Sequence, residues 1–222
     1  NGGQIIGGIG HTPERFRRAI GESGIRAIYQ MGMEARDIIN DRINTYEIKC
    51  DLKWGYCDVA LKNKHIRLFR EWKAFEREIG NPHTYTLLDK QELKEFVNSD
   101  RYVGGLHNTS NGHIHPLNLC IGEAEVVTKL GGEIYEQSRV LDLEKKFNPV
   151  VHTEHGSVSA KNVVLAGNAY MGNLVPKLSR HILPSASSVI ATAPIPEALA
   201  REILPGDVAV CDPRTALDYF RL

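Results

Sequence analysis

Residues 115–141, HPLNLCIGEAEVVTKLGGEIYEQSRVL, decide the fold, because a helical pattern passes there directly into strand-like sequence. Apolar residues recur at helical spacing in its first half: Leu117, Ile121, Ala124, Val127 and Leu130. The glycine pair 131–132 ends this pattern, and 133–135 and 139–141 have the character of short strands. A helix that alternates with strands predicts an α/β or α+β fold.

The sequence after this stretch predicts more strands. Residues 150–153 and 157–160 flank the turn Glu154-His-Gly156 and are expected to form a hairpin. The run Val163-Val-Leu-Ala166 is wholly apolar, which is typical of a strand buried on both faces of an α/β sheet. Gly167-Asn-Ala169 follows at its carboxyl end, where ligands bind in open α/β sheets.

The sequence before residue 115 alternates in the same way. The pattern from Pro13 to Ile39 is helical, and its internal glycines predict two helices or one broken helix. Further elements are expected as strands at 46–61 with a turn near Gly55, a helix at 63–79, a strand at 85–88, a helix from Asp89 to about Val97, a strand at 102–106 and a loop at 107–112.

Composition excludes several classes of partner. Lys plus Arg and Asp plus Glu both number 27, so no net field attracts nucleic acid or an anionic membrane. No apolar run approaches the roughly 20 residues that cross a bilayer. The four cysteines form no C-x-x-C pair, and we expect reduced thiols in a cytoplasmic protein. The opening on Asn1 and the strand-like end at Leu222 indicate an internal piece of a longer chain.

Four passages follow one another along the chain: Asn1-Gly-Gly-Gln4, Gly112-His-Ile-His-Pro116 with its helix and Gly131-Gly-Glu-Ile, Gly156-Ser-Val-Ser-Ala160 leading into Val163–Ala169, and Pro184 to Pro194. In this order they together resemble glycine and D-amino-acid oxidase-like flavoproteins, in particular the branch that acts on gamma-glutamylputrescine. The resemblance implies a mixed-sheet substrate domain together with an incomplete part of an FAD-binding domain. It divides the chain into a flavin-side segment (1–45), substrate-domain strands and helices (46–112), a partial FAD-binding domain (113–183) and a return to the substrate domain (184–222).

The resemblance also implies positions for the binding residues. Asn1, Gly2, Gly3 and Gln4 would lie beside the isoalloxazine, where main-chain N–H groups approach the ring and tune its electronics. Val140 would contact the adenine, and Ala166 with Gly167 would pass the pyrophosphate. The substrate-pocket candidates are Tyr46, Trp54, Tyr56, His107 and Asn108. For Val140, Ala166, Gly167 and the pocket candidates, the alternative is ordinary core or edge packing. For the opening segment the alternative is a frayed terminus, which we expect in this chain because a chain end is seldom held.

The dinucleotide motif of that family is missing. Gly8-Ile-Gly10 gives only G-x-G, and Pro13 stands where the third glycine belongs. We therefore expect FAD in the full-length protein and an isolated chain that is folded but free of flavin.

Other site chemistries find little support. His113 with His115 and His152 with His155 have metal-like spacings, but no third ligand is suitably placed and no metal is expected. No G-x-S-x-G elbow supports a nucleophilic triad, and no catalytic residue is assigned.

The expected function is the FAD-dependent oxidation of the C–N bond of an amine or amino acid to an imine, with oxygen as electron acceptor. Gamma-glutamylputrescine is the substrate that the resemblance suggests, and sarcosine, glycine or another D-amino acid stays open. Two alternatives from other classes are a non-enzymatic binding or scaffold module and a nicotinamide-dependent dehydrogenase. A full-length protein without colour would favour the first, and an upstream nicotinamide-type fingerprint the second.

Overall fold

The computed structural model describes residues 2–8 and 14–222, with the side chains of residues 14 and 15 excepted. The chain forms two compact units. Unit 1 consists of Asn1–Val126 with Ala191–Leu222, and unit 2 consists of Val127–Ile190. These boundaries fall later in the chain than the expected divisions at 112/113 and 183/184. Helices and strands alternate in both units, so the fold is mixed α/β, as the sequence predicts.

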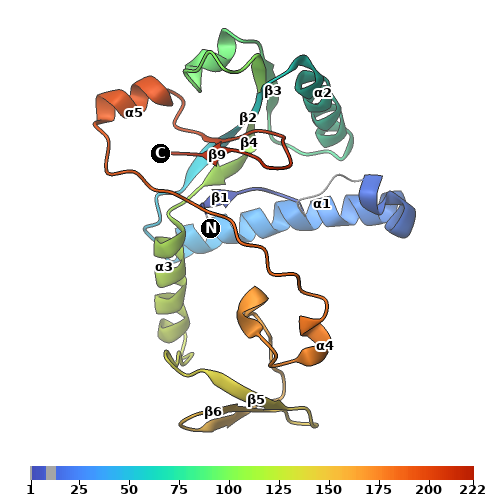
Figure 1. Cartoon of the computed structure of the whole chain (residues 1–222), viewed down its shortest axis with the longest axis vertical. Coiled ribbons are helices and arrows are strands. Elements are labelled where there is room, and N and C mark those ends of the chain that lie inside the picture. Colours follow the sequence, from blue (N-terminus) through green and yellow to red (C-terminus); the bar gives the residue numbers. More distant parts are fainter. Residues whose placement is uncertain (1, 9–13) are drawn as a thin grey trace. The chain divides into compact units, whose positions relative to one another are not determined.

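Unit 1 is built on a six-stranded mixed sheet with the order β1-β4-β2-β8-β9, in which β3 also pairs with β4 (Figure 1). Its strands are β1 (Gln4–Ile5), β2 (Lys53–Ala60), β3 (Tyr85–Leu88), β4 (Gly104–His113), β8 (Ala209–Cys211) and β9 (Tyr219–Phe220). Strand β2 runs antiparallel to β4 and parallel to β8. The longest strands therefore lie at the centre of the sheet.

Alternation along β2 separates the cores on the two faces of this sheet. Cys57 and Val59 belong to a core cluster with Leu93 of the 3-10 helix η1 (Glu92–Glu95). Ala60, on the other face, packs with Phe69 of the helix α2 (Asn63–Glu78). Since successive side chains of a strand point to opposite faces, Tyr56, Asp58 and Ala60 share the face that α2 covers in part.

The remaining helices of unit 1 are α1 (Glu14–Thr45), most of α3 (Pro116–Lys129) and α5 (Glu197–Ile203). Helix α1 is broken at Gly21, whose φ of 64° is left-handed, which confirms the predicted interruption. The carboxyl end of α1 and the helix α3 share a core that contains Ile43, Ile114 and Val126. Within the described residues, no helix has the length and apolarity that a bilayer span requires.

Three local predictions in unit 1 were wrong. Residues 107–112 are not a loop but the second half of β4, because β2, β3 and β1 supply backbone partners for this polar run. Gly55 makes no turn; with a φ of 130° it lies at the register shift between Trp54 and Tyr56 inside one continuous strand. The helix expected from Asp89 to Val97 is only the single turn η1, although Asp89 Oδ1 accepts capping bonds from the N–H groups of Gln91 and Glu92.

Unit 2 contains a three-stranded antiparallel sheet of β5 (Val140–Glu144), β6 (Val150–Thr153) and β7 (Ser157–Ser159). The hairpin of β6 and β7 confirms the sequence prediction, and its turn is closed by the N–H of Thr153 on the carbonyl of Gly156, at 2.8 Å. Residues 133–135, expected as a strand, have no regular structure. The unit also holds the short helices η2 (Asn168–Met171) and α4 (Pro176–Ser179).

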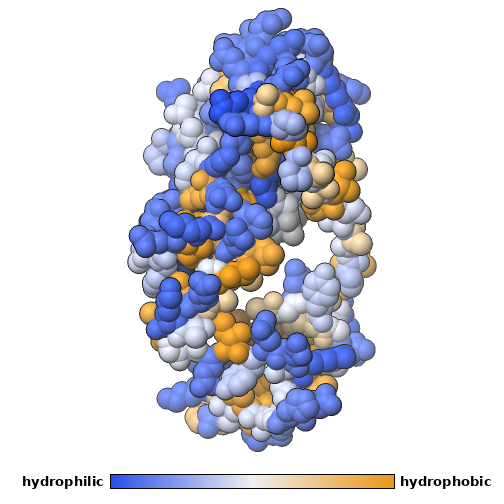
Figure 2. Space-filling model, turned by 90° about the vertical axis from the view of Figure 1, so that its left-hand side faces the viewer, coloured by the Kyte–Doolittle hydropathy of each residue, from blue (hydrophilic) through white to orange (hydrophobic). Residues whose placement is uncertain are grey.

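The apolar run 162–166 forms no strand, contrary to the prediction. Val164 is 87% exposed, and no described strand pairs with the run. An isolated extended segment has no ladder partners for its N–H and C=O groups, so apolar composition alone does not make it a strand. Large apolar side chains are exposed elsewhere in the chain too, and Figure 2 shows apolar surface interspersed among hydrophilic residues.

Candidate functional site

The opening segment Gly2–Gln4 is held in place by unit 1. The Nε of Arg221 donates to the carbonyl of Gly2 at 2.8 Å, and the N–H of Ile114 donates to the carbonyl of Gly3 at 2.8 Å. Gln4 begins β1 and lies opposite His113 of β4. The expectation that these residues fray was therefore wrong for residues 2–4, because sheet pairing and Arg221 fix them. Asn1 lies outside the described residues.

The two glycines of this segment sit where no side chain fits. A Cβ on Gly2 would lie 2.5 Å from the Tyr219 ring. A Cβ on Gly3 would lie 2.2 Å from the carbonyl oxygen of Ile114 and 2.9 Å from Pro116 Cδ, and Gly3 also has a left-handed φ of 74°. Close packing against unit 1 itself therefore requires glycine at both positions.

Gln4 connects this segment to the middle of the sheet. Its Nε2 donates to the carbonyl oxygen of Val210 at 3.1 Å, and its Oε1 lies 3.4 Å from the hydroxyl of Tyr56. Burial, together with the nearby Asp58 carboxyl and Cys211, raises the pKa of Tyr56, so the phenol stays protonated. Two residues predicted for different parts of the site, Gln4 and Tyr56, are thus in contact.

Asp58 is a polar residue of this face that the sequence analysis missed. It lies on β2 opposite Leu106 of β4 on one side and Cys211 of β8 on the other. Its side chain is half-buried, and burial raises its pKa to about 7. The available signal was the strand alternation itself, which places this carboxyl on the same face as Tyr56.

Of the other pocket candidates, Asn108 lies beside Tyr56 as its register partner on β4, whereas His107, Trp54 and Tyr46 do not gather there. His107 points to the opposite face of the sheet, where its ring stacks on Phe96 with centroids 4.4 Å apart. Asn108 is buried opposite Tyr56, and its Oδ1 accepts a bond from the N–H of Asn111 at 3.0 Å. Trp54 is 38% exposed, with the Arg36 guanidinium 5.9 Å from its ring centroid. Tyr46 is exposed just after α1.

Unit 2 carries the remaining predicted cofactor contacts. Val140 is half-buried in β5 opposite Thr153. Ala166 and Gly167 are exposed, and the carbonyl of Gly167 accepts the N–H of Tyr170 at the start of η2, at 2.9 Å. An open groove in this unit is lined by Leu143, Lys145, Lys146, Pro149, Lys161, Asn162, Val163 and Leu165. The adenine and pyrophosphate roles of Val140, Ala166 and Gly167 stay predictions.

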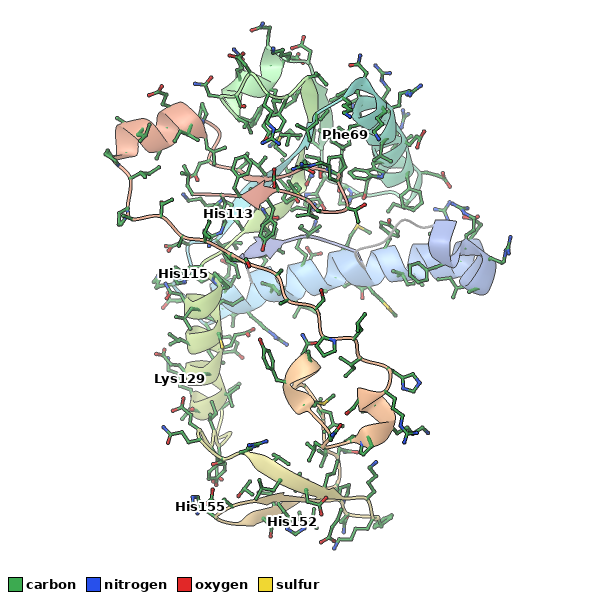
Figure 3. All side chains as sticks on the ribbon, in the orientation of Figure 1. Phe69, His113, His115, Lys129, His152 and His155 are labelled. Atoms are coloured by element: carbon green, nitrogen blue, oxygen red, sulfur yellow. The ribbon has the colours of Figure 1, made fainter. Side chains whose placement is uncertain are left out.

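The histidines have individual structural roles (Figure 3). His113 is only 2% exposed, and its Nε2 lies 3.2 Å from the carbonyl oxygen of Asp207. His115 stands at the entry to α3, and its Nδ1 accepts the N–H of Asn118. His152 pairs with Glu144 at 2.8 Å, whereas His155 is exposed in the hairpin turn. Within the described part of the chain, no group of three or more His, Cys, Asp or Glu side chains is arranged to hold a metal ion.

A buried ion pair closes the turn between β8 and β9. Asp212 is 2% exposed, and its carboxylate accepts bonds from Arg214 Nη2 at 2.6 Å and from the N–H groups of Arg214 and Asp218. Arg214 also pairs with Asp218. Burial acts to raise the pKa of Asp212, but these hydrogen bonds outweigh it and lower the pKa. The turn therefore fixes Tyr219 and Arg221, both of which contact the opening glycines.

Comparison with known proteins gives matches over the whole chain. The family model described as DAO, FAD dependent oxidoreductase, matches residues 1–222. The chain is 39% identical over 223 residues to gamma-glutamylputrescine oxidoreductase of Escherichia coli (strain K12), with 100% of this chain and 52% of the relative covered. It is 37% identical over 228 residues to the probable oxidoreductase OrdL of Haemophilus influenzae, with 100% of this chain and 53% of the relative covered.

The fold agrees with this result. L-proline dehydrogenase from P. horikoshii matches with a TM-score of 0.66 and 17% identity, over 92% of this chain and 54% of that protein. At this level of identity the likeness concerns the fold alone. The chain spans about half the length of the curated relatives that it matches.

Proposed function

The chain belongs to the DAO family of FAD-dependent oxidoreductases, and from this membership we propose that the whole protein oxidises the C–N bond of an amine or amino acid. The observation that carries the proposal is the match of the family model to all 222 residues. The contact of Gln4 with Tyr56 adds support, because it joins the segment expected beside the flavin to the sheet expected to hold the substrate.

We propose that the segment Gly2–Gln4 forms one flank of the flavin site. Gly2 and Gly3 leave the backbone without side chains, and Gln4 is anchored on Val210, so the segment has a fixed shape. When bound, FAD would accept a hydride equivalent from the carbon attached to the amine nitrogen. The protein's part is to exclude water and to aim that carbon, for which the rigid sheet around Tyr56 is suited.

We propose gamma-glutamylputrescine as the substrate, on the strength of the 39% identity to an enzyme named for it. Loss of a hydride equivalent and a proton from the CH–NH₂ group gives an imine, which water hydrolyses to an aldehyde and ammonia. Oxygen is the proposed final electron acceptor. We also propose a cytoplasmic location, supported by the free cysteines Cys50, Cys57, Cys120 and Cys211, because reduced thiols are typical there.

The test uses the full-length protein that contains this chain, purified with its cofactor. Mixed without oxygen with gamma-glutamylputrescine, it should lose its visible flavin absorbance, whereas the same compound acetylated on its terminal amine should cause no loss. A colourless protein, or a flavin that no amine or amino acid bleaches, would refute the proposal. Bleaching by glycine or sarcosine alone would keep the reaction and replace the substrate.

A further inference from the structure

Among the described residues, Asp58 has no counter-charge. Within the described residues its carboxylate makes neither a side-chain hydrogen bond nor an ion pair, and burial is the cause of its raised pKa. The titratable groups that sense its charge are Tyr56, Cys57, Tyr85 and Cys211, none of which is a cation. Burial also raises the pKa of each of these four groups, so they stay neutral beside it.

The Asp58 carboxylate is half-buried, so water or a ligand can reach it; the fully buried side-chain atoms without a partner in the described residues are His113 Nδ1 and Asp207 Oδ1. Native proteins pair or solvate buried charges, because removal of a carboxylate from water without a partner is costly. Every other buried or half-buried carboxylate with a described role here has a donor: Asp212 has Arg214, and Glu76 has the Asn81 side-chain amide at 2.7 Å. Asp58 has no such donor within the described residues, so its carboxylate is available to a cation from outside the chain.

The position of Asp58 relates it to the proposed reaction site. Tyr56, two residues earlier on the same face of β2, reaches Gln4 of the flavin-side segment. The spacing of alternate strand residues puts Asp58 about 6.6 Å farther along that face. Ala60, at the next step, is covered by Phe69 of α2. Asp58 thus lies between the Gln4–Tyr56 contact and the packed core.

We propose that Asp58 binds the ammonium group of a cationic amine substrate, and so selects amines over uncharged or anionic compounds. The inference rests on the proposed function, which it deepens by naming the group that recognises the substrate. An ammonium ion supplies the charge and the N–H donors that the carboxylate lacks. Cys57 and Val59 point to the other face of the sheet. The Asp58 carboxyl is therefore the charged group of β2 that lies between Tyr56 and Ala60 on the face of Tyr56.

The test compares Asp58→Asn, Asp58→Glu and a matched control, Asp41→Asn, in the full-length protein with FAD. Asp41 is an exposed acid of α1. Anaerobic flavin reduction is followed at increasing concentrations of gamma-glutamylputrescine, which separates the half-saturation concentration from the limiting rate. Flavin content and thermal stability are measured for each variant, so that loss of folding is seen directly.

Asp58→Asn should raise the half-saturation concentration at least tenfold while the limiting rate changes less than about threefold. Asp58→Glu, which keeps the charge, should recover most of the affinity, and Asp41→Asn should match the parent protein. Affinity of the parent should fall as the pH drops below about 7, and this dependence should vanish in Asp58→Asn. If Asp58→Asn loses flavin or folding, Asp58→Glu decides the question through its retained affinity and pH dependence.

Unchanged affinity in Asp58→Asn, in a protein whose flavin the amine still reduces, would overturn this inference and leave the proposed function intact. Equal loss of affinity in Asp58→Asn and Asp58→Glu, with the pH dependence kept in both, would also overturn it. Failure of the parent protein to be reduced by any amine would instead refute the proposed function itself.

Discussion

Replacement of Gly3 by alanine tests how tightly the opening segment is held. The left-handed φ of 74° costs a residue with a Cβ about 1–2 kcal/mol. The new Cβ would also lie 2.2 Å from the Ile114 carbonyl oxygen, which is backbone and cannot rotate away. To relieve this contact, the 2.8 Å hydrogen bond from Ile114 to Gly3 must lengthen, at a cost of about 1 kcal/mol. The expected loss in the free energy of unfolding is therefore about 2–3 kcal/mol.

Gly8→Ala is the matched control. Gly8 has a similar left-handed φ of 90°, but a Cβ there meets nothing within 4 Å. Its cost should be the backbone strain alone, about 1–2 kcal/mol. The two variants thus separate strain from steric exclusion.

The assay is urea unfolding followed by tryptophan fluorescence, since Trp54 and Trp72 both lie in unit 1. Gly3→Ala should unfold at a midpoint about 0.5 M lower than Gly8→Ala. Equal midpoints would mean that Gly3 is not packed against Ile114, and the description of a fixed flavin-side segment would be wrong.

Three further predictions concern stability. Phe69→Ala should lower the free energy of unfolding by about 3–5 kcal/mol, because Phe69 is fully buried against Ala60 and Leu106; a loss below 1 kcal/mol in urea unfolding would contradict the packing of α2. Asp212→Asn should cost about 2–3 kcal/mol at pH 7. Because the pKa of Asp212 is lowered in the folded state, its contribution to the free energy of unfolding is present above the unfolded pKa of about 3.9 and is lost as the pH falls below it. The difference in free energy of unfolding between parent and variant should therefore shrink toward pH 3. A difference that stays constant with pH would refute the ion pair. Asp58→Asn in the isolated chain should have the opposite effect. Since the pKa of Asp58 is raised to about 7 in the folded state, the parent loses stability as the pH rises through 7, and the variant should be more stable than the parent at pH 8 by about 1–2 kcal/mol. A variant that is less stable than the parent at pH 8 would show that the carboxylate has a partner.

The features that periodicity determines were predicted well from the sequence. Helix α2, strand β3 and the β6–β7 hairpin lie where apolar spacing and turn residues place them. The break at Gly21 also follows from a local rule, since glycine adopts the left-handed φ without a Cβ penalty. These elements depend on residues close together in the sequence.

Features that depend on distant partners were not predicted. Residues 107–112 are polar and were interpreted as a loop, yet strands from three other parts of the chain pair with β4. The reverse holds for the run 162–166. Its apolar composition predicted a buried strand, yet no described strand pairs with it. Strand pairing is set by tertiary context, which a local pattern does not contain.

In the candidate site, too, some residues could be predicted from the sequence and others could not. The resemblance predicted Gly2–Gln4, Tyr56 and Asn108 as site residues, and the structure brings Gln4 and Asn108 beside Tyr56. It also grouped His107 with Tyr56, although the parity of β4 puts these two on opposite faces of the sheet. Asp58 was overlooked because one carboxyl in a strand has no motif, and only its lack of a partner in three dimensions makes it notable.

A crystal structure of the full-length protein with FAD and an amine inhibitor would test the central claim most directly. That claim is that Gly2–Gln4 and the Tyr56–Asp58 face of β2 border one flavin and substrate site. The expected result is the isoalloxazine beside Gly3 and Gln4, with the ammonium group of the inhibitor within hydrogen-bonding distance of Asp58. A flavin bound against the opposite, His107 face of the sheet, or no flavin at all, would contradict the claim.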